Sequence, residues 1–201
     1  MRVLRAADYP TQPWKNGGGL TREILKVPAE GTDFDWRLSL ATVAAAGPFS
    51  SFAAYQRTLV LVDGAGVALD FGAHGRAVLR TRGESAAFDG AWPTSCTLID
   101  GPSTDLNLII AKERAQAASR VMTLTQPEKI DTAGWEETLI CCLHGELRIQ
   151  SEAGGSALLS ALDVARCSPE DSALTCSSPD SAMLFLAAMR RLPGTGSMQA
   201  A

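Results

Sequence analysis

Short runs of β-branched and apolar residues follow one another along almost the whole chain, and Gly, Pro, Asp and Ser residues separate them. Such runs favour β-strands, whereas no apolar pattern with the helical period persists beyond about three turns. The sequence therefore predicts an all-β, or mainly β, protein. The clearest predicted strands cover residues 20–27, 34–43, 58–62, 66–71, 77–81, 95–99, 106–111, 138–143, 146–151 and 182–189.

A weak internal repeat divides the chain into two halves. Residues 57–66 and 137–146 each have the pattern of a strand, a glycine turn and another strand. A second turn signal follows each of them, at residues 82–89 and 160–166. Between the halves, the polar residues 111–120 are good helix formers, and they predict either a helix or an ordered connection.

This order of strands and turns resembles the cupin barrel, a double-sheet jelly roll. Two such halves form a bicupin, with two jelly-roll-like β-barrels in one chain. We expect an N-terminal barrel at residues 1–115, a C-terminal barrel at residues 116–192 and a mobile tail at residues 193–201, which lack a core pattern. A pair of generic β-sandwich halves is the alternative, because every all-β chain has strands at regular spacing.

The charge balance argues against one class of partner. A formal net charge of −4, without a basic patch, argues against duplex nucleic acid, whose binding depends on Lys and Arg side chains that neutralise phosphates. The cations are 14 Arg and 4 Lys. Arg is the better residue for bidentate recognition of carboxylates, although genome composition alone also explains such a bias.

The apolar stretches argue against a membrane partner. The longest, at residues 59–62, 138–143 and 183–189, are much shorter than the roughly 18 residues that a membrane span needs. Charged residues interrupt the N-terminal segment where a signal peptide needs an apolar core. We therefore expect a cytoplasmic protein. Its 5 cysteines have no CxxC spacing, which indicates reduced thiols that mostly pack in the core.

The histidine count restricts the chemistry. Metal-binding cupins use two or three histidines on one ion, but this chain has only His74 and His144, one in each half. The same shortage removes most arrangements of a nucleophile with a histidine base. We therefore predict no metal, no cofactor and no catalytic residue. Gly17 to Gly19 lack the Lys-Ser/Thr pair and the helix of a phosphate loop.

The densest group of unusual residues is Pro13-Trp-Lys-Asn-Gly-Gly-Gly-Leu-Thr-Arg-Glu-Ile24. Together with Phe34-Asp-Trp-Arg-Leu-Ser39, Gly47-Pro-Phe-Ser50, Arg57-Thr-Leu-Val-Leu-Val-Asp-Gly64, Phe88-Asp-Gly90 and Asp105-Leu-Asn107, it resembles the HutD/Ves family over about the first 112 residues. The resemblance implies a metal-free bicupin associated with bacterial histidine utilisation, and for Ves members with stress responses.

Strand alternation selects the candidate site. On residues 34–40, Arg37 and Ser39 lie opposite the apolar face, and the resemblance favours a polar pocket for them, whereas Asp35 fits a solvated face. Asp105 and Asn107 share one face of their strand, either in a pocket or on the surface. The predicted ligand-binding residues are Trp14, Lys15, Asn16, Arg22, Arg37, Ser39, Asp105 and Asn107.

The function we expect is non-catalytic binding of a small anionic metabolite, a carboxylate linked to histidine breakdown, by a regulatory protein of this pathway. The regulatory part is implied by the resemblance alone. A metal-independent enzyme of the isomerase or lyase class is the alternative, with Lys15 and either Asp105 or Glu23 in acid–base roles. A third option is a structural or protein-binding module. The oligomeric state is left open, a homodimer included.

Overall fold

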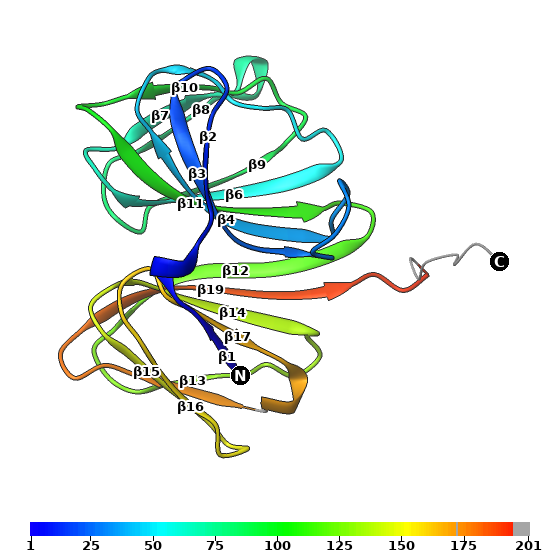
Figure 1. Ribbon diagram of the computed structural model, residues 1–201, viewed down its shortest axis with the longest axis vertical. Helices are drawn as coiled ribbons and strands as arrows, with labels where there is room; N and C mark the ends of the chain where they lie inside the picture. Colours follow the sequence, from blue (N-terminus) through cyan, green and yellow to red (C-terminus); the bar gives the residue numbers. More distant parts are fainter. Residues whose placement is uncertain (172, 195–201) are drawn as a thin grey trace.

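The computed structural model describes residues 1–171 and 173–194, and every strand predicted from the sequence is present in it (Figure 1). The mainly β prediction is confirmed. In the described residues the helical elements are the 3₁₀ turns η1 (Ala6–Asp8), η2 (Gly72–His74) and η3 (Pro169–Asp171). None of these short turns could serve as a membrane-spanning helix. Of the predicted tail, residues 195–201 lie outside the described part of the chain.

The strands form four antiparallel sheets. The first half holds a six-stranded sheet in the order β2 (Thr11–Pro13), β3 (Gly19–Val27), β4 (Trp36–Val43), β11 (Ser103–Ala111), β6 (Tyr55–Asp63) and β9 (Ser85–Asp89). Its partner is a four-stranded sheet in the order β5 (Gly47–Pro48), β10 (Ser95–Leu98), β7 (Val67–Asp70) and β8 (Arg76–Leu79).

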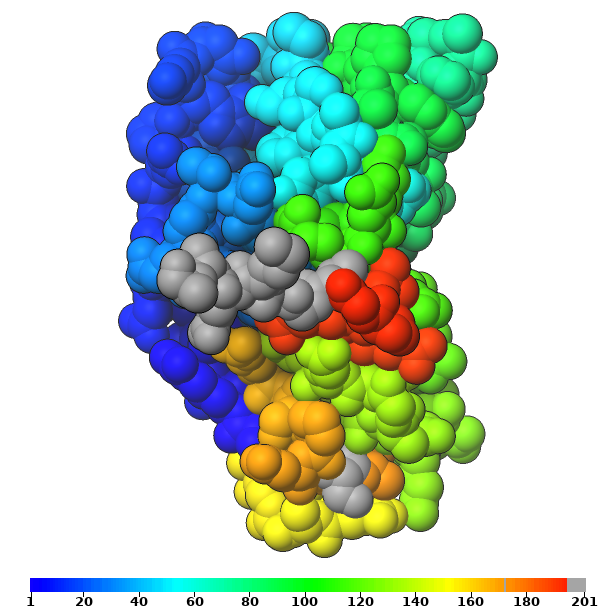
Figure 2. All heavy atoms as spheres, turned by 90° about the vertical axis from the view of Figure 1, so that its right-hand side faces the viewer, coloured from blue at the N-terminus to red at the C-terminus, as the bar shows by residue number. Residues whose placement is uncertain are grey.

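The second half repeats this plan. A five-stranded sheet has the order β1 (Arg2–Leu4), β17 (Val164–Cys167), β14 (Glu137–His144), β19 (Ala182–Arg191) and β12 (Ala115–Leu124). A four-stranded sheet has the order β13 (Glu128–Ile130), β18 (Leu174–Ser177), β15 (Leu147–Ser151) and β16 (Ser156–Leu159). Figure 2 shows the two halves stacked along the long axis, with the N-terminal segment running down one side.

Three apolar cores hold the four sheets together. One fills the first pair of sheets, for example with Leu59 and Phe88, and a second fills the other pair. The third joins the six-stranded sheet to the five-stranded sheet, where Trp36 and Leu38 meet Phe185. Because β4 buries its apolar face in this third core, its alternate residues must face the inside of the first half.

Two segments differ from the sequence-based expectation. Residues 111–120 do not form a helix, because β12 pairs with β19 over ten residues and this pairing overrides the helix propensity of the segment. The sequence predicts residues 2–4 in the first half, but β1 pairs with β17 of the second half. Apart from this placement of β1, the division of the chain into two barrels at residue 115 stays a prediction.

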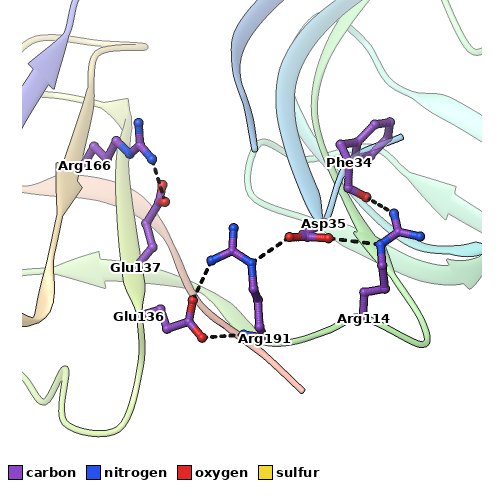
Figure 3. Close-up of polar contacts among 7 residues, drawn as sticks. All are labelled: Phe34, Asp35, Arg114, Glu136, Glu137, Arg166 and Arg191. Atoms are coloured by element: carbon purple, nitrogen blue, oxygen red, sulfur yellow. Dashed lines mark hydrogen bonds and ion pairs between the residues drawn. The ribbon is translucent and has the colours of Figure 1, made fainter. Parts of the chain in front are cut away.

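Asp35 connects the two halves through charges, as Figure 3 shows. Its carboxylate accepts a hydrogen bond from Arg114 Nε at 3.0 Å and another from Arg191 Nε on β19 at 2.8 Å. Arg191 also pairs with Glu136 at 2.9 Å. With its side chain only 14% exposed, Asp35 is not the solvated residue that the strand pattern predicts.

We expect Asp35→Ala to lower the free energy of unfolding by about 1–3 kcal/mol, because both guanidinium groups lose a charge-assisted hydrogen bond but can still reach water. Urea denaturation followed by tryptophan fluorescence measures this. Asp100→Ala, at an exposed position, is the control and should unfold like the wild type. Equal stability of the two variants would contradict a linking role for Asp35.

Candidate functional site

A cavity of about 460 Å³ lies against the inward face of the six-stranded sheet, and its volume is typical of small-molecule pockets. Inward-facing side chains of β4, β11 and β6 form one wall, and the β2–β3 loop and residues 48–52 complete it. The structure brings most of the predicted site residues together here: Trp14, Lys15, Asn16, Arg37, Ser39, Asp105 and Asn107 line the cavity.

Strand register arranges the wall in three rows, each crossing β4, β11 and β6. The rows are Arg37 with Ile109 and Arg57, then Ser39 with Asn107 and Leu59, then Ala41 with Asp105 and Leu61. Successive rows start about 7 Å apart, because two residues of a strand separate them. One end of the wall is therefore cationic, its middle is neutral and polar, and its other end is acidic.

Arg57 is a cation buried among aromatic rings. The residue is 5% exposed, and its guanidinium carbon lies 5.0–5.4 Å from the ring centres of Phe49, Phe52 and Phe88. One Nη donates to the carbonyl oxygen of Ser50 at 3.4 Å, and the buried Nε has no protein partner. Burial lowers the pKa of Arg57 to about 10, so the side chain is still charged at neutral pH.

Asp105 and Asn107 present buried acceptors. Asp105 is 2% and Asn107 8% exposed, and the Oδ1 atom of each has no protein partner. Burial raises the pKa of Asp105 to about 7, and attraction to Arg57 limits the rise. Buried polar atoms without partners are rare in folded proteins, and such atoms on a cavity wall suit a ligand that supplies the missing hydrogen bonds.

The β2–β3 loop closes one side of the cavity. Trp14 donates its Nε1 hydrogen to Thr21 Oγ1 at 2.8 Å and packs edge-on against Phe49. A Cβ at Gly19 would lie 2.3 Å from the carbonyl oxygen of Thr42, so this position requires glycine. Asn16 accepts from the Gly18 amide at 3.0 Å and shapes the loop, while Lys15 is exposed at the mouth.

Arg22 is the predicted site residue that does not line the cavity. It lies opposite Leu40, which faces the core between the halves, and its guanidinium carbon is 5.8 Å from the centre of the Tyr9 ring. The neighbouring Glu23 instead accepts from Arg37 Nε at 2.8 Å and orients that guanidinium. Strand alternation correctly places Arg22 and Glu23 on opposite faces of β3. The face that carries Arg22, however, is the one that packs toward the second half.

Sequence reasoning missed Arg57 and the aromatic residues around it as part of the site. Residues 58–62 are apolar at almost every position because both faces of β6 are buried, so alternation does not show which face Arg57 joins. The available signal was its place in the quoted motif at residues 57–64, together with Phe49 in the motif at residues 47–50.

The described residues contain no group of three or more His, Cys, Asp and Glu side chains that could hold a metal ion. His74 stacks on Trp92 with ring centroids 4.5 Å apart, and His144 Nδ1 lies 2.7 Å from Arg82. Both therefore have partners outside the cavity. Freedom from metal and cofactor stays a prediction, which elemental analysis of the purified protein would check.

The comparisons with known sequences place the chain in a family. The family model HutD matches residues 6–185. An uncharacterized 21.2 kDa protein from the hutC 3′ region of Pseudomonas putida is 44% identical over 119 residues, which cover 58% of this chain and 62% of that protein. Protein Ves of Citrobacter koseri is 34% identical over 126 residues, 62% of this chain and 65% of Ves. The matches thus span less than two thirds of these relatives.

Solved structures agree over nearly the full length. A conserved protein of unknown function from Pseudomonas aeruginosa PAO1 has a TM-score of 0.86 at 31% identity and covers 94% of this chain and 97% of its own. HutD from Pseudomonas fluorescens SBW25 has a TM-score of 0.79 at 31% identity, with coverage of 95% and 98%. A cupin barrel protein from Leptotrichia buccalis, 10% identical with a TM-score of 0.59 and coverage of 93% and 100%, shares the fold. The chain therefore belongs to the HutD family and has a cupin-type fold.

Proposed function

We propose that this protein binds a small carboxylate linked to histidine utilisation in the cavity beside Arg57 and that it acts as a regulator without catalysing a reaction. The buried guanidinium of Arg57 carries the proposal, because the residue lines the cavity and its Nε has no hydrogen-bond partner in the described protein. A buried cation is stable only when an anion or several hydrogen bonds compensate it, and a ligand carboxylate supplies both.

The charge count of the cavity supports an anionic ligand. The lining residues include three cations, Lys15, Arg37 and Arg57, and one carboxylate, that of Asp105. Glu23 accepts a hydrogen bond from the Nε of Arg37, and this hydrogen bond does not involve the Nη groups of Arg37. Two guanidinium groups in one row offer bidentate contacts to a carboxylate, which an ammonium group does not provide.

The link to histidine utilisation rests on the relatives, and the regulatory role rests on the family resemblance alone. One is named from the hutC region and one solved relative is HutD, which suggests a ligand from the breakdown of histidine. Small acids are formed by such a pathway, and a binding protein that responds to them would tune it. A role in stress responses, which the family resemblance alone implies, is a further part of this proposal.

Titration calorimetry with small carboxylates, including acids formed from histidine, tests the proposal. We expect saturable binding to the wild type and a loss of about 10- to 100-fold in affinity for Arg37→Met, since a charge-assisted hydrogen bond to the ligand disappears. Arg22→Met is the matched control, because Arg22 lies outside the cavity, and its affinity should be unchanged. No binding of any acid to the wild type would overturn the proposal.

A metal-independent isomerase or lyase is the second candidate, and Asp105 is the observation that favours it. Its pKa of about 7 suits a general acid or base at neutral pH. Asp105 takes this role better than Glu23, which is held by Arg37 outside the cavity lining. Lys15 at the mouth is the other candidate group.

Incubation of the protein with the acids that bind, followed by mass-resolved chromatography, distinguishes the two functions. A sensor returns each acid unchanged, and Lys15→Arg keeps most of the binding because a cation is retained. An enzyme forms product, and either Lys15→Arg or Asp105→Asn abolishes turnover while binding persists. Product formation by the wild type would overturn the sensor proposal and show that the protein is an enzyme.

A further inference from the structure

The cavity wall carries hydrogen-bond acceptors that a ligand with only a carboxylate group cannot satisfy. A carboxylate only accepts hydrogen bonds, so it can satisfy the arginine row but not the Oδ1 atoms of Asp105 and Asn107. These two oxygens are themselves acceptors and need N–H or O–H donors. At the acidic end, moreover, an ionised Asp105 repels any carboxylate that approaches it.

We propose that the ligand is a bifunctional acid whose carboxylate contacts Arg37 and Arg57 while N–H donors at its other end contact Asp105 and Asn107. This inference rests on the proposed function and names the class of its ligand. The three rows of the wall fix the orientation, because the row with Arg37 and Arg57, the row with Asn107 and the row with Asp105 follow one another along the strands. Asp105 and Asn107 are thus the residues that set specificity between acids.

The contacts around Asp105 fit a donor-bearing group. Its row partners across the sheet are Ala41, a small residue, and Leu61, neither of which donates a side-chain hydrogen bond. The cationic groups that line the same cavity are Arg57 on β6, Arg37 on β4 and Lys15 on the loop, and none of them forms an ion pair with Asp105 within the described contacts. Burial raises the pKa of Cys96 on β10 to about 12, and the negative charge of Asp105 contributes a smaller part of this rise.

A matched pair of probes tests the inference. Succinamate and levulinate have the same number of non-hydrogen atoms, and both carry one carboxylate, but succinamate ends in an amide NH₂ where levulinate ends in a methyl group. At about pH 8 Asp105 is ionised. We expect calorimetry to show at least about tenfold tighter binding of succinamate, since a buried charged acceptor gains a donor.

Variants of the acceptor end show where the preference arises. Asp105→Leu should bind succinamate and levulinate about equally while still binding levulinate, and Asn107→Leu should reduce the preference less. Equal affinity of the folded wild type for both probes would overturn the inference and leave the carboxylate proposal intact. If neither probe binds at millimolar concentration, the inference fails, and if other small acids also fail, the proposed function fails with it.

Discussion

Arg57→Met is expected to weaken carboxylate binding by about 100-fold or more, the largest effect of any single substitution in the cavity. The substitution removes the buried cation and its unpartnered Nε donor together. Met is close in length to the Arg stem and packs well against aromatic rings, so the space among Phe49, Phe52 and Phe88 stays filled. Titration calorimetry on the folded variant measures the loss.

Two controls accompany this variant. Arg57→Lys keeps a cation without the planar fork of donors and should retain part of the affinity. Arg22→Met removes an arginine that lies over Tyr9 and should bind like the wild type. A folded Arg57→Met protein with wild-type affinity would show that the ligand does not use Arg57.

Asp105→Asn is expected to stabilise the protein at alkaline pH by about 2–4 kcal/mol. Burial raises the pKa of Asp105 from 3.8 to about 7, so folding favours its protonated form. For an acid with a raised pKa, the contribution to stability is fully present below the unfolded pKa and is lost as pH rises through the folded pKa. The wild type therefore loses stability between about pH 4 and 8, and Asn at this position does not ionise.

Denaturation by urea at about pH 5 and pH 8 measures the difference. The variant should be the more stable protein at both pH values, and its advantage should be clearly larger at the higher pH, because the wild type has lost only part of its stability at about pH 5. Asp63→Asn, on the same half with a side chain that is 74% exposed, controls for the loss of one negative charge. A variant that is less stable than the wild type at pH 8 would contradict an uncompensated Asp105 carboxylate.

Where alternation is strict, the strand pattern is enough to predict which polar side chains share a face of the sheet, whereas the family resemblance favoured a pocket for Arg37 and Ser39. On β4 and β11 apolar residues alternate with polar ones, so alternation alone pairs Arg37 with Ser39 and Asp105 with Asn107 on the polar faces that line the cavity. The motif around Trp14 is recognisable for another reason, because its glycines and polar residues interrupt the strand pattern.

The sequence did not predict features that depend on how sheets stack. Both faces of β6 are buried because one faces the cavity half and the other faces the second half, so Arg57 has no alternating neighbours to place it. The same stacking takes Arg22 away from the cavity. Strand β12 could not be predicted from residues 115–124, because its pairing with β19 involves residues far away in the sequence.

Crystals soaked with 3-bromopropionate test the central claim most directly, because anomalous scattering locates the bromine independently of the protein. We predict one bromine peak inside the cavity, with the carboxylate of the probe on the Arg57 guanidinium and within reach of Arg37. The bromine cannot donate a hydrogen bond, so it should not contact Asp105. A probe bound elsewhere on the protein, with the cavity free of it, would contradict the assignment of this cavity as a carboxylate site.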